Sequence, residues 1–262
     1  MYIEPLIAAA ESLVDSSDAH VPSPGGFSPD PDTLAANRVV GFGRTDERVH
    51  PFFAMRSQLL RHASATGQRV FAVTSVEPGD GKTHVAVNLA AALSRIHPTV
   101  LIDLDLRWPS LGPRLGLPLP RFGVDDYLAG AASPGETGVR MAGFDLTLHP
   151  ARLRRFNAED LLASPRLLEF IQAVRAAEGA PICLIDTPPA LVNDDLMLIA
   201  RVVDGVLMVV HEAKTRARAL VDAVTSLSPT PIVGSILNKS ISSPRASADY
   251  DSYNRSATAR PR

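Results

Sequence analysis

The stretch VFAVTSVEPGDGKT, residues 70–83, decides the fold, because it joins a strand, a glycine loop and the start of a helix. Val70–Thr74 is an uninterrupted β-rich run, Pro78–Gly81 is typical of a tight loop, and Lys82 opens a helical pattern. The two glycines let the backbone approach a phosphate closely, and the helix N-terminus adds positive potential. This order of elements predicts a phosphate-binding loop.

Lys82 and Thr83 supply the side chains that such a loop uses toward a nucleotide. The lysine adds a point charge near the β- and γ-phosphates, and the threonine hydroxyl is placed to ligate Mg²⁺. The first glycine of the GxxxxGK[ST] pattern is absent, because Val76 occupies its position. We expect ATP and Mg²⁺ as cofactors, and the loop residues expected to bind the nucleotide are Pro78, Gly79, Asp80, Gly81, Lys82, Thr83 and His84.

Two further strands end in acids. LIDLDLR, residues 101–107, sets Asp103 and Asp105 two positions apart, so both side chains point the same way. They either share one magnesium site, or one holds metal while the other accepts a proton. Arg107 extends the same face and pairs either with an acid or with phosphate. The hydrophobic strand of ICLIDTPP ends in Asp186, which is the form expected of a strand that positions Mg²⁺.

Short β-rich runs alternate with helical patterns from about His50 to Asn238. Several strands are continuous hydrophobic runs, as expected when helices cover both faces of a parallel sheet. A chain of 262 residues with 45% hydrophobic content can bury one core. We therefore predict an α/β fold with a doubly wound, mainly parallel sheet and ligands at the carboxyl ends of its strands. The expected strands are Val70–Thr74, Val100–Asp103, Phe144–Leu148, Ile182–Asp186, Val206–Val210 and Ile232–Leu237, and the expected helices are Phe52–His62, Lys82–Ser94, Glu159–Ala176, Asp195–Val202 and Arg216–Ser226.

The two ends of the chain differ from this central region, which we place at residues 46–239. Residues 1–45 are acidic and rich in Pro and Gly, and we expect them to be largely flexible, with a linker over Val21–Asp32. A short helix over Tyr2–Val14 would serve either as a docking helix or as a frayed terminus. Residues 240–262 form a basic tail, which is too poor in apolar residues to order itself by burial. Two of the chain's four tyrosines, Tyr250 and Tyr253, lie in this tail.

Composition excludes several other classes of protein. A net charge of −2 and a pI near 6.4 give no sign of a nucleic-acid binder. The single cysteine, Cys183, lies inside an apolar strand pattern and is interpreted as a small core residue in a reducing cytosol. No apolar run approaches the ~18–20 residues that span a bilayer, so we expect a soluble, cytoplasmic chain.

Together, SxxPGxGKT at Ser75–Thr83, DxDxR at Asp103–Arg107 and DTPP at Asp186–Pro189 resemble a known family. These motifs are similar to those of the bacterial tyrosine kinases called BY-kinases, which belong to the MinD/ParA class of P-loop proteins. The resemblance covers roughly residues 50–240, and DxDxR is its most specific part. It implies an autophosphorylating tyrosine kinase that regulates capsule or exopolysaccharide synthesis and export.

The resemblance also implies a role for each matching residue. Lys82 and Thr83 would bind phosphates and Mg²⁺. Asp103 would be the base toward the incoming tyrosine hydroxyl, while Asp105 and Asp186 would organise the metal. The nucleotide contacts would extend to Arg107 and to Asn238, the latter resembling an adenine contact, and the phosphoacceptors would be Tyr250 and Tyr253.

Two positions depart from the family patterns. Glu77 stands where partition ATPases of this class carry a signature lysine, which disfavours their cross-dimer mechanism. The oligomerisation motif ExxRxxRTN survives only around Arg56, with His50 and Phe53 in place of its first Glu and Arg.

The expected partners are a separate membrane-embedded polysaccharide co-polymerase or activator chain, which would hold the protein at the inner face of the membrane, and further copies of the chain itself. The alternative function is an ATP-dependent switch or scaffold in a polysaccharide assembly complex, with little or no tyrosine kinase activity.

Overall fold

The computed structural model describes residues 26–43 and 46–240. The helix considered over Tyr2–Val14 and the two tail tyrosines therefore lie outside the described residues. Within them, seven strands form one sheet in the order β3-β4-β2-β5-β1-β6-β7. The strands are β1 (Val70–Ser75), β2 (Thr99–Asp103), β3 (Val139–Arg140), β4 (Leu146–His149), β5 (Ile182–Asp186), β6 (Gly205–His211) and β7 (Ile232–Asn238).

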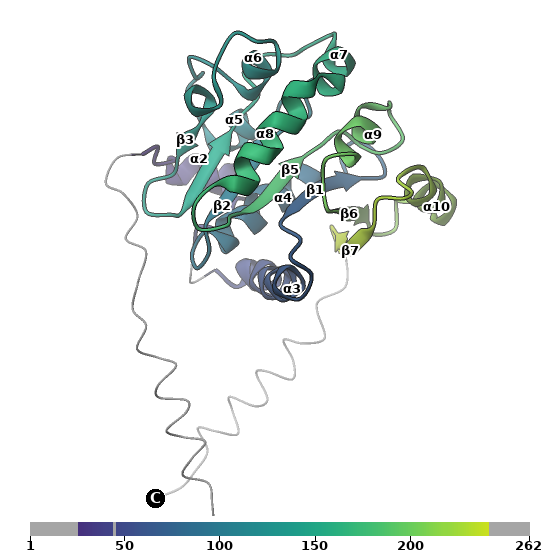
Figure 1. Cartoon of the computed structure of the whole chain (residues 1–262). Coiled ribbons are helices and arrows are strands. Elements are labelled where there is room, and N and C mark those ends of the chain that lie inside the picture. The colour runs from purple at the N-terminus through teal and green to yellow at the C-terminus, as the bar shows by residue number, and fades with distance from the viewer. Residues whose placement is uncertain (1–25, 44–45, 241–262) are drawn as a thin grey trace, which may run out of the picture.

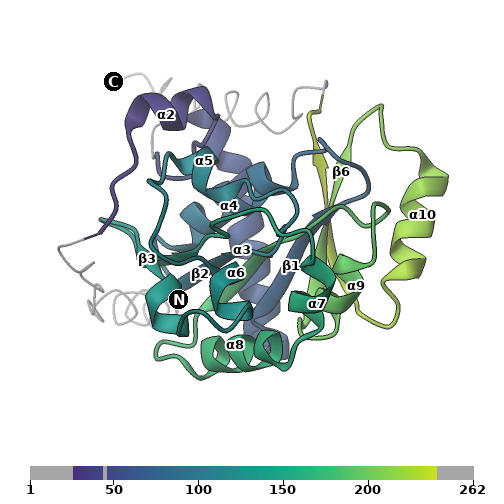
Figure 2. The same ribbon diagram turned by 90° about the horizontal axis from the view of Figure 1, so that it is seen from above.

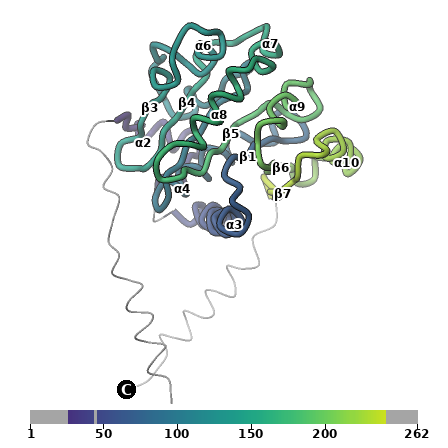
Figure 3. Tube along the Cα trace, viewed as in Figure 1, coloured from purple at the N-terminus to yellow at the C-terminus, as the bar shows by residue number. Residues whose placement is uncertain are grey.

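All neighbouring strands of this sheet run parallel, except for β3, which pairs antiparallel with β4. The two outermost strands, β3 and β7, lie at opposite ends of the sheet, as the tube in Figure 3 shows. The predicted doubly wound, mainly parallel α/β fold is confirmed. Of the strands, only β3 was not predicted, because two residues carry no readable pattern.

Helices cover both faces of the sheet (Figures 1 and 2). The α-helices are α2 (Pro31–Ala36), α3 (His50–Thr66), α4 (Lys82–Leu93), α5 (Leu111–Leu115), α6 (Val124–Leu128), α7 (Ala158–Ala163), α8 (Pro165–Ala176), α9 (Asp195–Ala200) and α10 (Ala217–Ser226). Two 3-10 turns add Glu47–Val49 and Pro134–Thr137. None of the helices in the described part of the chain combines the length and the apolar character that crossing a membrane requires.

Strand β1 shows how the core is divided between the two faces. Its alternate residues Phe71 and Val73 pack with α3 and α4 on one face. Val70 points to the opposite face, into the cluster that contains α8, and Ala72 joins the cluster of α9 and α10 on that side. The whole strand is buried, which is why its sequence shows no polar alternation. Cys183 of β5 lies in the same core with no exposed surface, and burial raises the pKa of its thiol.

The single helix predicted over Glu159–Ala176 is wrong, because the chain breaks at Ser164. This residue has extended backbone angles, with a ψ of 150°, and it separates α7 from α8. Pro165 follows it as the first residue of α8. A proline disfavours the helical conformation of the residue before it, and it fits well at the first helical position. The helices predicted elsewhere match α3, α4, α9 and α10.

Residues 26–43, which we call the N-terminal strap, pack onto the domain. Phe27 forms a parallel bridge with Met141, next to β3. Farther along, the side-chain oxygen of Asn88 on α4 accepts hydrogen bonds from the backbone N–H groups of Val40, at 2.7 Å, and Gly41, at 2.8 Å. Residues 26–43 are therefore packed against the domain, whereas the sequence pattern predicted a domain that begins at residue 46. The prolines of this segment led to its prediction as a linker, but Pro31 is the first residue of a helix and does not break one.

Candidate functional site

The phosphate loop, Val76–Gly81, connects the carboxyl end of β1 to the first residue of α4. Gly79 and Gly81 adopt φ values of 82° and 103°, in the left-handed region that favours glycine. Because of these angles the loop can turn its backbone N–H groups inward, above the first turn of α4. The first N–H groups of a helix have no partner within that helix, so this end of α4 is suited to an anion.

Asp80 fastens the phosphate loop from inside. Its side chain is fully buried and accepts a hydrogen bond from the backbone N–H of Glu77 at 2.9 Å. Lys214, in the segment that follows β6, donates to the other oxygen of the same carboxylate at 3.2 Å. The ammonium group of Lys214 also reaches the carbonyl of Pro78 at 3.3 Å. The Asp80 carboxylate therefore links the backbone of the phosphate loop, at Glu77, to Lys214 in the segment after β6.

The last strand fastens the phosphate loop from the outside. The side-chain amide of Asn238, at the end of β7, donates to the carbonyl of Asp80 at 2.8 Å. Lys239 donates to the carbonyl of Gly79, also at 2.8 Å. The predicted adenine contact of Asn238 stays a prediction, and the structure gives this residue a role in holding the loop.

Lys82 lies between two carboxylates at the start of α4. Its ammonium nitrogen is 2.8 Å from Asp105 Oδ2 and 3.7 Å from Asp186 Oδ1. Burial alone would lower the pKa of Lys82, but the charges of Asp186 and Asp105 outweigh it, so this pKa is raised. The Thr83 hydroxyl donates to Asp186 Oδ2 at 2.6 Å. The structure thus brings together four residues that the sequence placed on three separate stretches.

Asp103 is the most enclosed acid of the group. It stands directly beside Asp186 in the register of β2 and β5, and both side chains are fully buried. One of its carboxylate oxygens accepts hydrogen bonds from the N–H groups of Ser110 and Leu111, both at 3.0 Å. Burial, and secondly the charge of Asp186, raise the pKa of Asp103 to about 8. Burial raises the pKa of Asp186 as well.

The side-chain oxygens of Thr83 and Asp186 fit a nucleotide-bound Mg²⁺ ion. Asp186 Oδ1 is buried and accepts no hydrogen bond, and the Thr83 hydroxyl stands on the other oxygen of the same carboxylate. No group of three or more His, Cys, Asp or Glu side chains in residues 26–43 and 46–240 is arranged to hold a metal by itself. Mg²⁺ typically takes one or two protein oxygens and completes its shell with water and substrate phosphates. Thr83 and Asp186, with Asp105 nearby, provide that partial set.

Arg107 is turned away from the phosphate loop. Its guanidinium makes a two-point ion pair with Asp195, the first residue of α9, at 2.7 and 3.0 Å. It also donates to the carbonyl of Phe156 and lies 3.4 Å from Glu159 on α7. The sequence left open whether Arg107 pairs with an acid or with phosphate, and the structure shows it paired with an acid, Asp195. Its pair with Asp195 joins the loop after β2 to α9, beside α7 in both Figure 1 and Figure 2.

His84 packs its side chain away from the expected phosphate position. Its ring meets Phe52 of α3 edge-on, with centroids 5.8 Å apart, and Nδ1 lies 3.3 Å from the amide nitrogen of Asn88. Burial, followed by the charge of Arg114, lowers the pKa of His84 to about 4. The neutral ring therefore belongs to the interface between α3 and α4, and only its backbone N–H is left for the predicted nucleotide contact.

Sequence reasoning missed four residues that complete the site. Lys214, Lys239 and Asp195 belong to none of the three motifs recognised in the sequence. Ser110, whose hydroxyl is 2.9 Å from that of Thr83, was passed over as well. Only Ser110 carried a local signal, since it follows the DxDxR motif by three residues. Lys214 and Lys239 follow β6 and β7 and reach the phosphate loop only because of the sheet order, whereas Asp195 begins α9 and meets Arg107.

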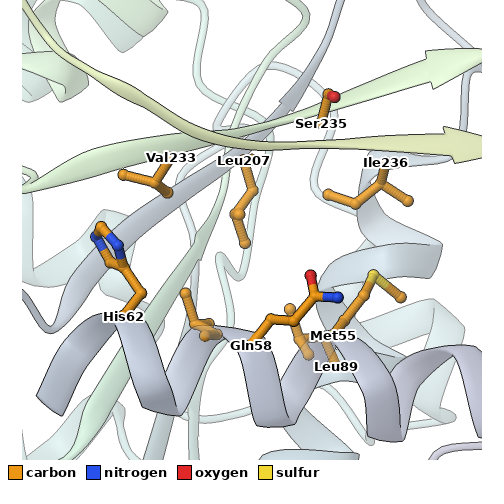
Figure 4. A pocket seen from close by; sticks show the side chains of 10 residues that line it. Met55, Gln58, His62, Leu89, Leu207, Val233, Ser235 and Ile236 are labelled. Atoms are coloured by element: carbon orange, nitrogen blue, oxygen red, sulfur yellow. The ribbon is translucent and has the colours of Figure 1, made fainter. Parts of the chain in front are cut away.

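A pocket elsewhere in the described structure lies apart from these residues. It opens between α3 and β7, where Met55, Gln58 and His62 of the helix face Val233 and Ile236 of the strand (Figure 4). Its lining is mainly apolar and contains no residue of the phosphate loop and none of the acids. This pocket therefore shares no residue with the candidate nucleotide site at the carboxyl end of the sheet.

No protein-family model matches the chain. Individual relatives do. The chain is 34% identical over 179 residues to the succinoglycan biosynthesis transport protein ExoP of Rhizobium meliloti, covering 65% of this chain and 22% of that protein. It is 31% identical over 215 residues to the tyrosine-protein kinase wzc of Salmonella typhimurium, covering 80% and 29%. The tyrosine-protein kinase CpsD of Streptococcus agalactiae is 27% identical over 205 residues, which cover 77% of this chain and 88% of CpsD.

Solved structures agree with these relatives. The VpsO kinase domain is 28% identical with a TM-score of 0.66, and the match covers 80% of this chain and 96% of that domain. The kinase domain of the Escherichia coli tyrosine kinase ETK gives a TM-score of 0.72 at 22% identity, covering 84% and 86%. The septum site-determining protein MinD of Pyrococcus horikoshii, complexed with Mg-ADP, gives 0.55 at 22% identity. The last two establish a likeness of fold. The chain spans less than a third of the length of ExoP and wzc.

Proposed function

Because the chain belongs to the BY-kinases, of the MinD/ParA class of P-loop proteins, we propose that it is an ATP- and Mg²⁺-dependent, autophosphorylating protein tyrosine kinase. Its pathway is the regulation of capsule or exopolysaccharide synthesis and export, as the names of its relatives suggest. The observation that carries the proposal is the convergence of Lys82, Thr83, Asp105 and Asp186 within hydrogen-bond or ion-pair reach of one another. Phosphoryl transfer depends mainly on positioning and charge neutralisation, which such a cluster provides.

Each residue of the site would have its own role in phosphoryl transfer. The N–H groups of Pro78–Thr83, apart from the proline, and the ammonium of Lys82 hold the phosphates. Thr83, Asp105 and Asp186 would hold Mg²⁺, which neutralises charge on the transferred group when bound. The tyrosine oxygen forms the new bond to the γ-phosphorus, ADP leaves with the electrons of the broken bond, and the tyrosine proton passes to Asp103.

Asp103 suits that last step in one respect. Its raised pKa makes its ionised carboxylate a stronger base than a solvent-exposed aspartate, and the charge of Mg²⁺ arriving with the nucleotide would favour this ionised form. Backbone N–H groups hold its side chain in place, so its orientation is fixed before the tyrosine arrives. The acceptors are Tyr250 and Tyr253 of the tail.

The proposed setting is the inner face of the membrane. The proposed partner is a separate membrane-embedded polysaccharide co-polymerase or activator chain, which would hold the protein there. The names of the relatives, a biosynthesis transport protein and tyrosine kinases, support this setting. We therefore place the chain in the cytoplasm, peripheral to its partner, with homo-oligomers among the assemblies to be tested.

Mass spectrometry tests the proposal directly. The full chain is incubated with Mg-ATP and the cytoplasmic tail of its membrane partner, alongside Lys82→Met, Asp103→Asn and the control Asp160→Asn, an exposed residue of α7. We expect phosphate on Tyr250 or Tyr253 in the wild type and in the control, and none in the two site variants. Hydrolysis of ATP with both tyrosines unmodified would reject the kinase and favour the switch.

One observation favours that second candidate, an ATP-dependent switch or scaffold. Arg56, the surviving arginine of the oligomerisation motif, is used within the chain. It donates to the carbonyl of Ala92 at 3.2 Å and stacks on Phe53 at 4.7 Å from the ring centroid. An arginine held in this way is poorly placed to reach a neighbouring copy, so a ring of the family type would need other contacts.

A further inference from the structure

Trp108 and Arg154 are in contact beside the acids, and two further exposed side chains, Leu153 and Phe156, belong to the same short segment as Arg154; we call these four residues the aromatic rim. Trp108 is 63% exposed and Phe156 94%, and Leu153 is also exposed. Single exposed apolar residues are ordinary, but a group of them around one cation is typical of a binding surface. The rim has no role in the phosphate-binding cluster, since none of its side chains contacts Lys82, Thr83 or Asp186.

Hydrogen bonds to backbone carbonyl groups attach the rim to the loop that follows β2. The N–H of Trp108 donates to the carbonyl of Asp105 at 3.0 Å. Arg154 donates through Nε to the carbonyl of Arg107 at 2.8 Å. Arg107 in turn donates to the carbonyl of Phe156 at 3.3 Å. Since both loops follow carboxyl ends of parallel strands, a ligand on the rim would lie next to the acids.

Arg154 is the cation that this surface offers. Its guanidinium lies over the Trp108 ring, 3.4 Å from the centroid, so the aromatic face holds it in place. Its neighbour Arg155 is committed to Asp125 and Asp126, and Arg107 is committed to Asp195. Within residues 26–43 and 46–240, no carboxylate pairs with Arg154. Its charge is therefore available to an acidic ligand.

The chain itself carries a segment with the matching chemistry. In the tail, Asp249-Tyr250-Asp251-Ser252-Tyr253, both of the acids present after residue 239 flank Tyr250. We propose that the aromatic rim binds this segment, with Arg154 pairing to an aspartate and Trp108 and Phe156 contacting the tyrosine ring. This inference rests on the proposed function and gives it a substrate preference, for tyrosine flanked by aspartate.

The ion pair of Arg154 and the aromatic contacts are expected to contribute to binding in different ways. An exposed ion pair changes affinity by no more than about fivefold, so Arg154 selects among acceptors rather than anchoring them. The aromatic side chains supply the contact area. Reversing the charge replaces attraction by repulsion, and we expect an effect of about tenfold on affinity for the acidic segment.

Trp108 makes binding measurable, because it is the only tryptophan of the chain. The host is the full chain with Asp249→Asn and Asp251→Asn, which weakens competition from its own tail. A peptide of residues 246–254 is titrated while Trp108 fluorescence is followed, and the same peptide with both aspartates replaced by asparagine is compared. We expect the acidic peptide to bind about two- to fivefold more tightly. Arg154→Glu should abolish that preference, and Arg140→Glu, an exposed arginine of β3, should keep it.

Equal affinity for the two peptides overturns the inference, and this comparison needs no variant of the rim. Adding Mg-ATP to the same mixtures separates the inference from the proposed function. Peptide that is phosphorylated equally fast by wild type and Arg154→Glu rejects the rim and leaves the kinase standing. Peptide that binds in an Arg154-dependent way but stays unphosphorylated supports the rim and contradicts the kinase.

Discussion

Lys82 is the residue on which the electrostatics of the site depend. It stands between Asp105 and Asp186, and Asp103 is paired with Asp186 in the register of the neighbouring strands β2 and β5. Burial is the first cause of the raised pKa of Asp103 and of Asp186, and the excess of negative charge that three buried acids and one cation leave adds to it. A divalent cation arriving with a nucleotide would balance this excess. The acids therefore favour binding of the metal–nucleotide complex over the free nucleotide.

His149 provides a test of burial at the scale of a single residue. It is buried on β4 against Phe170, with Nδ1 2.9 Å from the Thr137 hydroxyl, and burial lowers the pKa of His149 to about 4. The unfolded chain has the ordinary value near 6.5, so the stability due to the neutral ring is present above pH 6.5 and is lost as the pH falls to 4. The full loss is about 3 kcal/mol.

We expect His149→Gln to flatten this part of the pH dependence. The measurement is the free energy of unfolding in urea at several pH values between 7 and 4. His50→Gln is the control, since His50 is exposed. If the free energies of unfolding of the wild type and of His149→Gln fall in parallel over this pH range, the buried ring does not resist protonation.

At the scale of elements, α8 shows how one helix face carries the stability of the domain. Phe170 is fully buried in the cluster under α8, whereas Leu168, two residues earlier, is half exposed. Phe170→Ala should lower the free energy of unfolding by about 3–5 kcal/mol, because it removes a large ring and leaves a cavity. Leu168→Ala on the same helix should cost less than about 1 kcal/mol. Similar losses for the two variants, measured by chemical denaturation, would contradict the packing described here.

The N-terminal strap is the second element with a specific test. A Cβ at Gly41 would approach Ala91 Cβ to 2.8 Å and would also meet the backbone of Asn88. Gly41→Ala should therefore push the strap off α4, at a cost of about 1–3 kcal/mol, and should speed tryptic cleavage after Arg38. Gly135→Ala meets nothing within 4 Å and serves as the control. Unchanged cleavage in Gly41→Ala would mean that the strap is not held as the structure shows.

At the scale of the whole molecule, the sequence revealed the strands better than the connections. Strands such as β1 and β5 are buried on both faces, so their hydrophobic runs were easy to recognise. Sheet order then explains why three separate acid and lysine motifs meet at one edge. It also explains what was missed: Lys214 reaches Asp80 only because β6 pairs with β1, and Arg107 meets Asp195 across 88 positions of sequence. No local pattern records such contacts.

The central claim is that the site transfers phosphate to tyrosines of the tail. The most direct measurement follows ATP consumed and phosphotyrosine formed in one reaction, for the wild-type chain and for Tyr250→Phe/Tyr253→Phe. The account predicts phosphotyrosine in the wild type and none in the double variant, which keeps the complete site and still hydrolyses ATP. Equal phosphotyrosine in both proteins, or hydrolysis without phosphotyrosine in either, would contradict it.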